Sequence, residues 1–521
     1  MEGRQLFSRR QFVAGVAVLG GTLALTACGA NPSPKDESAA GGDGNSGSEA
    51  KETDIVVIGS GLAGSACARA AALGGAKVTL VDKAPFYMST FLTSLGNVSI
   101  AQVPENKDYW LFEDGEPDTM EAFTERYKAA TEIGKVDAPY PDYERMQRMM
   151  EESCKTINWA NEMGIGFKES FTKEQVGTDT VKPDAPADTS IKAGQDVADA
   201  FQSELEKLGV EIMLSTEATK LLQEGDTIVG ITVKDGKKEQ DIKAKAVVLA
   251  VGGFGGSDSY RDELVPAINK MGFQYLGNAM NTGDGMTMGK AVGAATYEDC
   301  WVIPNVIMPT RKLTEAEPGF SKLCDTGMEG AATSSKMLVD ASGKRFVNEA
   351  GPTTALATSM TDNAAGPYFV LFDSSNADVV ALIEKGLDTG DVFKAESIEE
   401  LAEAAGTATL AETFAAYQAA AEAGADGEFN KKAEMLVPYQ DGPYYLVSFV
   451  PSFVATMGGV RTNGDCQVIR EDESAIDGLY AIGECTHRYM YNRSFVRHCS
   501  NSSALTMGRL TGTTLAETVT A

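Results

Sequence analysis

Short apolar runs that end on glycine turns recur along the chain from residue 53 and predict buried strands that alternate with helices. The first run, Asp54 to Ile58, leads directly into glycines at 59, 61 and 64 and then into an alanine-rich helix. A second run, Lys77 to Val81, ends on Asp82. Strand, glycine turn, helix, strand and acid follow one another in the order that a dinucleotide-binding βαβ unit requires.

The three glycines of this turn have separate expected tasks. Gly59 permits the tight turn, Gly61 lets the backbone approach a pyrophosphate, and Gly64 lets the helix pack closely on the strand. The N-terminus of the helix would present free N–H groups and a partial positive charge to the phosphates. Asp82 is placed to accept hydrogen bonds from ribose hydroxyls. An ordinary glycine turn is the alternative.

The pattern that follows the second strand predicts a mixture of helices, a hairpin and further glycine turns. Helices are expected at 118–134, 142–164 and 194–209, a strand pair at 228–233 and 239–243 around Asp235-Gly236, a strand at 246–250, and glycine turns at 251–256 and 281–288.

Glycine turns become less frequent between about Cys300 and Ala455. In this region a strand is expected at 369–373 and alanine-rich helices at 398–424. A strand that ends on Glu484 and a helix from about Asn501 then return to the same pocket, more than four hundred residues after the first turn. This layout favours a flavin over a nicotinamide. The expected fold is α/β, with a two-part Rossmann-like FAD-binding domain, 53–299 and 457–521, interrupted by an α+β capping domain, 300–456.

The first 28 residues have the features of a targeting segment. Twin arginines at 9 and 10 precede an apolar run, Val13 to Ala27, and Leu25-Thr-Ala-Cys28 is similar to a lipobox. We expect cleavage before Cys28, a lipid on its thiol, a flexible linker at 29–52, and a location on the outer face of the cytoplasmic membrane, periplasmic or at the cell surface. A single membrane anchor is the alternative.

Composition narrows the possible partners. The net charge of −29 argues against nucleic acid and against an anionic membrane surface, so the membrane is expected to be contacted only through the lipid. Seven further cysteines are scattered without a CxxC pair, and no metal is expected, although a cluster built from distant cysteines stays open.

Several collinear segments resemble the FAD-dependent fumarate reductase and 3-ketosteroid dehydrogenase superfamily, in particular its exported reductase branch. These are Gly59–Gly64, Leu249–Phe254, Thr282–Gly285, Gly343–Glu349, Thr456–Gly459 and Gly478–Glu484. The resemblance implies FAD as cofactor, hydride transfer from the flavin to an activated C=C bond, and a side chain that protonates the neighbouring carbon.

The resemblance and the glycine turns together give a set of expected FAD-binding residues. Glu484 would lie at the adenosine and pyrophosphate side, and the helix from Asn501 would aim its N-terminus at the pyrimidine edge of the flavin. The full set is Gly59, Gly61, Leu62, Ala63, Gly64, Asp82, Lys83, Ala218, Gly252, Gly253, Asp284, Glu484, Asn501, Ser502 and Ser503.

The substrate side departs from the family pattern and implies a non-standard active site. Thr353 stands where the family has its proton-donating arginine, and Ala332 stands where the relay arginine should be, although Glu329 matches the relay glutamate. The histidine that the family has just before Met-Gly-Gly has no counterpart in Val454-Ala455-Thr456, and Met308 stands where the family has the histidine of its His-Pro-Thr loop.

One substrate anchor survives beside a loop, 486–493, that is three residues longer than its family counterpart. Arg497 matches the arginine that holds a substrate carboxylate; a structural salt bridge is the alternative. We also count Tyr489, Tyr491 and His498 as catalytic candidates. The tyrosines would donate a proton if Arg488 or Arg493 lowered their pKa; otherwise they pack around the flavin or the cap. His487 is expected to be an ordinary loop residue.

The expected function is reduction of an enoate, aryl acrylate or enone by an exported enzyme in anaerobic respiration. Loss of the carboxylate clamps favours an acceptor with fewer negative charges than fumarate. A separate cytochrome or flavoprotein would supply electrons. Two alternatives stay open: a dehydrogenase that introduces a C=C bond into a ketosteroid-like substrate, and a non-catalytic flavin electron carrier.

Overall fold

The computed structural model describes most of the chain beyond the linker. The described residues are 51–89, 100–103, 118–132, 135–171, 179–183, 190–324, 328–351, 356, 359–360, 366–496 and 498–521. The predicted signal, including Cys28, and residues 29–50 of the predicted linker lie outside them. Residues 51 and 52, predicted as the end of the linker, instead form a short strand that pairs with Ile242 and Lys243. In the described part of the chain, no helix has the length and apolar character needed to cross a bilayer.

A six-stranded sheet forms the centre of the nucleotide-binding part and joins both halves of the chain. Its order is β18 (Gln467–Ile469), β19 (Ala475–Ala481), β11 (Ala246–Leu249), β2 (Ile55–Ile58), β3 (Val78–Val81) and β7 (Glu211–Met213). All neighbours are parallel except β18 and β19. Because β19 comes from the C-terminal region and pairs with β11, the expected two-part domain is confirmed.

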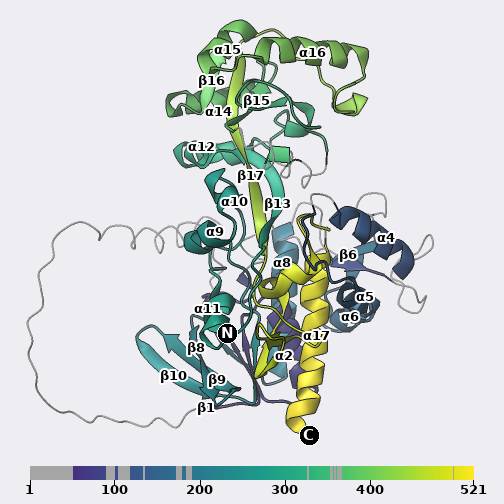
Figure 1. Cartoon of the computed structure of the whole chain (residues 1–521), viewed down its shortest axis with the longest axis vertical. Helices are drawn as coiled ribbons and strands as arrows, with labels where there is room; N and C mark the ends of the chain where they lie inside the picture. Colours follow the sequence, from purple (N-terminus) through teal and green to yellow (C-terminus); the bar gives the residue numbers. More distant parts are fainter. Residues whose placement is uncertain are drawn as a thin grey trace, which may run out of the picture. The chain divides into compact units, whose positions relative to one another are not determined.

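The helix α2 (Leu62–Leu73) packs on this sheet, and the long C-terminal helix α17 (Cys499–Thr520) packs on α2 (Figure 1). Small residues bring the two helices close together. A Cβ at Gly508 would collide with the Ala63 carbonyl, and one at Gly512 with the Cys67 carbonyl. The helix α8 (Ser190–Lys207) also packs against α2.

The predicted hairpin is confirmed within a second, four-stranded sheet of order β1-β10-β9-β8. Asp235 pairs with Lys238 across the turn. The strands are β1 (Lys51–Glu52), β8 (Glu217–Glu224), β9 (Thr227–Asp235) and β10 (Lys238–Lys243).

The helix expected at 142–164 is two helices, α5 (Tyr143–Glu151) and α6 (Ser153–Asn161). The Ser153 hydroxyl donates to the Met150 carbonyl at 2.7 Å, and such a bond competes with helical hydrogen bonding. The helix expected at 118–134 is α4 (Met120–Thr131). A small sheet of β4 (Ile100–Gln102), β6 (Asp179–Pro183) and β5 (Phe167–Phe171) was not predicted.

The inserted part is built on β17 (Tyr444–Met457), which pairs with β13 (Trp301–Pro309) along one stretch and with β15 (Tyr368–Phe372) and β16 (Val392–Ala395) along another (Figure 1). Trp301 pairs with Met457 where these two strands leave the nucleotide-binding part. The predicted boundaries at 300 and 456 stay a prediction.

Both faces of this cap sheet are buried under helices. Successive residues of β15 alternate between two apolar clusters, Tyr368 and Val370 in one and Phe369 and Leu371 in the other. The covering helices are α12 (Arg311–Ala316) and α14 (Ala377–Ile383) on one face and α15 (Ile398–Ala405) and α16 (Leu410–Ala423) on the other. An antiparallel sheet between helices is the α+β cap that was expected.

Candidate dinucleotide site

The first glycine turn leaves one face of the backbone open. A Cβ at Gly59 would collide with the Ala250 carbonyl, and one at Gly64 with the carbonyl of Gly59, so both glycines serve the packing of turn, strand and helix. At Gly61, the N-cap of α2, a Cβ would meet no atom within 4 Å. An anion can therefore approach the N-terminus of α2 at this residue, as expected for a pyrophosphate.

Asp82, at the tip of β3, is anchored to the turn. Its carboxylate accepts hydrogen bonds from the N–H and hydroxyl of Ser60 at 2.7 and 2.6 Å and from the Ala84 N–H at 2.8 Å. These bonds orient the carboxylate, and its contact with a ribose stays a prediction. Ala218 lies on β8, two residues after Thr216, whose N–H donates to the Asp82 carbonyl.

Two predicted residues from distant segments pair with each other. Lys83 lies 2.6 Å from the Asp284 carboxylate and 2.6 Å from the Thr282 hydroxyl. The pair places the N-terminus of α11 (Asp284–Ala291) beside the end of β3. The strand that ends at Asp82 and the glycine turn at 281–288 therefore meet.

Glu484 is the meeting point of four of the segments found in the sequence. Its Oε1 accepts hydrogen bonds from the Thr456 N–H at 2.9 Å and hydroxyl at 3.0 Å, and its Oε2 from Asn281 at 3.3 Å. A Cβ at Gly253 would overlap both Thr456 and Glu484, so this glycine makes room for protein atoms. Gly252 makes room for Asn281 in the same way.

The carboxyl of Glu484 has an unusual acidity. Burial raises its pKa to about 7, although hydrogen bonds from Thr456 and Gly253 act in the opposite direction. Among the described residues no cation forms an ion pair with it. Thr456, which lies in the segment where the family histidine has no counterpart, therefore binds Glu484.

The helix α17 begins at Cys499, close to the predicted start. His498 is its N-cap in a left-handed conformation, with φ 67°, and its carbonyl accepts the Ser502 N–H at 3.2 Å. A Cβ at Gly483 would lie 2.9 Å from Cβ of Ala63, and Gly508 packs on Ala63 as well. The first turn of α17, with Asn501, Ser502 and Ser503, thus lies near the N-terminus of α2.

The long loop is tightly bound to its surroundings. Tyr489 Oη lies 2.9 Å from Ser503 Oγ, and Tyr491 Oη lies 3.0 Å from Ser500 Oγ. Asn492 exchanges two hydrogen bonds of 2.9 Å with the backbone of Val136. The loop therefore holds the first turn of α17 against the layer of α4 and α5.

The condition under which the loop tyrosines would donate a proton, a pKa lowered by Arg488 or Arg493, is not met. Burial raises the pKa of Tyr489 and, more strongly, that of Tyr491. Arg488 stacks on Tyr140 at 4.4 Å and pairs with Asp299, and Arg493 stacks on Trp301 at 4.6 Å. These arginines are directed elsewhere, so the packing alternative for the tyrosines is favoured.

A different arginine contacts Tyr489. The guanidinium carbon of Arg145 lies 3.8 Å from the centroid of the Tyr489 ring. The sequence carries no signal for this contact, which joins residues more than three hundred positions apart. Asn281 and Thr456 were missed as Glu484 partners for the same reason.

The remaining substrate-side candidates are only partly described. Arg497 and Thr353 lie outside the described residues, and their roles stay predictions. His487 is buried, and burial lowers its pKa to about 3. Among the described residues neither ring nitrogen of His487 has a hydrogen-bond partner, so it is a neutral buried residue and not an ordinary loop residue.

The positions of the family's carboxylate clamps carry little charge. Met308 is buried on β13, and the Thr310 hydroxyl donates to Asp391 at 2.5 Å within the cap. Glu329 is exposed, and Ala332 caps a short 3-10 helix, 333–335.

The described cysteines show no sign of a metal centre. All seven are buried. No group of three or more potential ligands comes together among the described residues, so the cluster left open by the sequence has no support in this part of the chain.

Comparison with known proteins connects the site to one family. Residues 54–503 match the family described as FAD binding domain. An NADH:fumarate oxidoreductase of Klebsiella pneumoniae is 27% identical over 450 residues, which are 85% of this chain and 45% of that protein. A 3-oxosteroid 1-dehydrogenase of Mycobacterium tuberculosis is 25% identical over 537 residues, covering 83% of this chain and 92% of that protein. The chain therefore spans less than half the length of the Klebsiella pneumoniae protein.

The fold has counterparts among solved structures. The open conformation of a flavocytochrome c3 fumarate reductase superposes with a TM-score of 0.65 at 24% identity, over 90% of this chain and 79% of that one.

Proposed function

The chain belongs to the FAD binding domain family and takes FAD as its cofactor, and on that premise we propose that it is an oxidoreductase acting on CH–CH groups. In the proposed direction it reduces an activated C=C bond of an organic acceptor. The similarity to an NADH:fumarate oxidoreductase and to a 3-oxosteroid 1-dehydrogenase supports this reaction class.

The observation that carries the proposal is the convergence at Glu484. Asn281, Thr456 and Gly253 come from three separate segments and surround one carboxyl beside the phosphate turn. A dinucleotide with a bulky second ring needs such a composite site, because its two ends must be held by different parts of the chain.

The residues of this chain suit FAD along its length. Gly61 and the N-terminus of α2 would hold the pyrophosphate, and Asp82 the adenosine ribose. The first turn of α17 would face the pyrimidine edge of the ring. When bound, FAD supplies the hydride chemistry, and the protein orients the substrate and excludes water.

We further propose a substrate that carries fewer negative charges than fumarate: an enoate, an aryl acrylate or an enone. Two observations support this substrate class. Met308, which stands at one family histidine, is buried. The other family histidine has no counterpart in 454–456, where the Thr456 hydroxyl donates to Glu484. Arg497 is the proposed anchor for a single carboxylate or a carbonyl.

The reverse reaction is the second candidate. The 3-oxosteroid 1-dehydrogenase is matched over nearly its whole length, which favours a ketosteroid-like substrate that is oxidised. An electron carrier without its own substrate is the remaining alternative.

Export is proposed from the sequence alone. The twin arginines and Cys28 support a lipid-anchored protein on the outer face of the cytoplasmic membrane. A separate cytochrome or flavoprotein would then deliver electrons for anaerobic respiration.

The test is anaerobic mixing of the reduced, FAD-loaded protein with enoates, aryl acrylates, enones and fumarate, while the absorbance of oxidised flavin is followed. Rapid reoxidation by one of the first three classes, with the saturated product identified, supports the proposal. Reoxidation by fumarate alone contradicts the proposed substrate class. The oxidised protein is tested in parallel with saturated ketosteroids; reduction of the flavin there, without reaction in the first assay, supports the reverse reaction. No reaction in either assay supports the carrier.

A further inference from the structure

Arg145 is a buried cation without an anionic partner in the described part of the chain. It lies on α5 and is 6% exposed. Its guanidinium donates to the Thr462 carbonyl at 3.2 Å and to Cys466 Sγ at 3.6 Å, and its Nε has no hydrogen-bond partner there. The carboxylate of Asp142 accepts only the backbone N–H of Arg145, at 3.0 Å. Burial of a charge without a counter-ion is costly, so this arrangement calls for an explanation.

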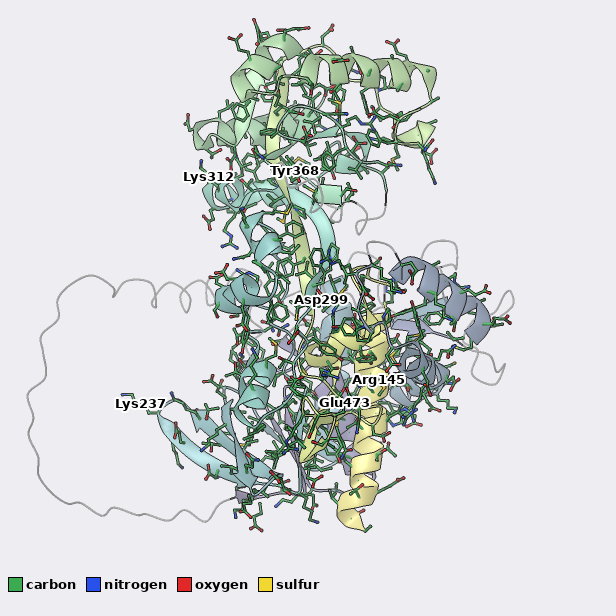
Figure 2. The ribbon with its side chains drawn as sticks, viewed as in Figure 1. Arg145, Lys237, Asp299, Lys312, Tyr368 and Glu473 are labelled. Atoms are coloured by element: carbon green, nitrogen blue, oxygen red, sulfur yellow. The ribbon has the colours of Figure 1, made fainter. Side chains whose placement is uncertain are left out.

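The guanidinium is connected to the first turn of α17 through a single side chain. Tyr489 lies with its ring under Arg145, and its hydroxyl lies 2.9 Å from Ser503 Oγ. The Tyr489 carbonyl accepts the N–H of Asp142, the N-cap of α5, at 2.7 Å. The helix α5 therefore holds Tyr489 at its ring and at its backbone. Figure 2 shows Arg145 beside α17, against which α5 packs.

We propose that Arg145 is a positioning residue for the flavin: acting through Tyr489, it fixes the first turn of α17 and raises the reduction potential of the bound FAD. The inference rests on the proposed placement of the flavin at this turn. It assigns a task to a residue that the sequence did not single out.

Two physical effects of the Arg145 charge support this proposal. A cation over the face of a phenol draws electron density from the ring and makes its hydroxyl the better donor, so Tyr489 donates to Ser503 and stiffens the turn. The charge itself also lies in a poorly screened interior, where a positive charge favours added negative charge on a nearby ring. With no carboxylate paired to Arg145, its field is not cancelled locally.

The test measures the midpoint potential of FAD in the purified full-length holoprotein, by redox titration against a reference dye and without any acceptor. Arg145→Gln is expected to make the potential more negative by about 30 mV or more, a tenfold higher ratio of oxidised to reduced flavin at a fixed poise. Arg145→Lys keeps the charge and is expected to shift it less. Tyr489→Phe removes only the hydroxyl and is expected to give an intermediate shift.

Arg148→Gln is the matched control. Arg148 lies one turn further along α5 and contacts the same segment as Arg145, residues 462–466, at the Gly464 carbonyl and Asp465, but it is exposed. Its substitution is expected to leave the potential unchanged.

An unchanged potential in Arg145→Gln with full FAD content would overturn the inference. If that variant fails to fold or to retain FAD, Tyr489→Phe and Arg145→Lys decide, and wild-type potentials in both would overturn it equally. Because no substrate is used, failure of every acceptor in the reaction assay leaves this result intact, and an unchanged potential leaves the proposed reaction intact.

Discussion

Two buried arginines, one in the cap and one in the nucleotide-binding part, have opposite surroundings. Arg345 in the cap is 4% exposed and makes hydrogen bonds of 2.8 and 2.9 Å to Glu349 and one of 2.9 Å to Asp426. Lys431 lies 3.3 Å from Glu349 and completes a balanced group. Among the described residues, the guanidinium of Arg145 contacts only a carbonyl, a thiol and an aromatic ring.

Two buried glutamates, Glu349 in the cap and Glu484 in the nucleotide-binding part, differ in the same way as the two arginines. Glu349 is enclosed by two cations, whereas Glu484 is bound by a threonine and an asparagine and has no described cation partner. The group around Arg345 in the cap is therefore neutral as a whole. Arg145 and Glu484, in the part where the cofactor is proposed to bind, have no ion-pair partner among the described residues.

The largest expected effect comes from breaking the balanced group in the cap. Arg345→Met leaves Glu349 and Asp426 with only Lys431, and we expect a loss of about 3–5 kcal/mol in the free energy of unfolding. Urea titration of the holoprotein measures it. The exposed Lys432–Glu434 pair provides the control, since Glu434→Gln should change stability by less than about 0.5 kcal/mol. Equal losses of unfolding free energy in Arg345→Met and Glu434→Gln would contradict a stabilising role for the buried group.

A pH dependence is expected from Glu484. Its folded-state pKa of about 7 lies above the ordinary 4.5, so between these values the folded FAD-free protein binds more protons than the unfolded chain. Stability should therefore fall as pH rises through this window, by on the order of 2 kcal/mol. Denaturant unfolding of FAD-stripped protein across that range measures the slope. Glu484→Gln should lose this part of the slope; an unaltered slope would refute the assignment.

Among the described residues, two glycines combine an open Cβ position with an ordinary φ: Gly61 in the nucleotide-binding part and Gly427 in the cap. Gly61→Val fills the space at the N-terminus of α2, and we expect FAD binding at least roughly tenfold weaker, about 1.4 kcal/mol. Gly427→Val in the cap adds the same side chain in open space and should leave the FAD dissociation constant unchanged. Fluorescence titration of the stripped proteins with FAD compares them.

The smallest expected effect separates the two loop tyrosines. Tyr491→Phe removes the hydrogen bond to Ser500, and unfolding should become easier by about 1 kcal/mol. Tyr491 has no arginine stacked on its ring among the described residues, so the flavin potential should not change. A shift as large as that of Tyr489→Phe would mean that the cation over Tyr489 has no special effect.

Much of the fold could be predicted because its signals are local. The turn at Asp235-Gly236 and the helices within 398–424 follow from residues a few positions apart. The break at Glu152 was missed, because it depends on where the Ser153 hydroxyl is directed. The site could be predicted in part: the packing roles of Gly59 and Gly64 are confirmed, and the pyrophosphate contact of Gly61 stays a prediction. Gly253, predicted to bind FAD, makes room for Glu484 and Thr456.

The sequence by itself determined the βαβ unit, the inserted cap and the family resemblance, because apolar spacing and glycine positions act over short stretches of chain. Only the tertiary structure decided which charges are neutralised. Arg145 meets Tyr489, and Glu484 meets Asn281, across hundreds of residues, and the pKa of each buried group depends on every element packed around it. Burial raised the pKa of Tyr489 and Tyr491, although arginines stand next to them in the sequence.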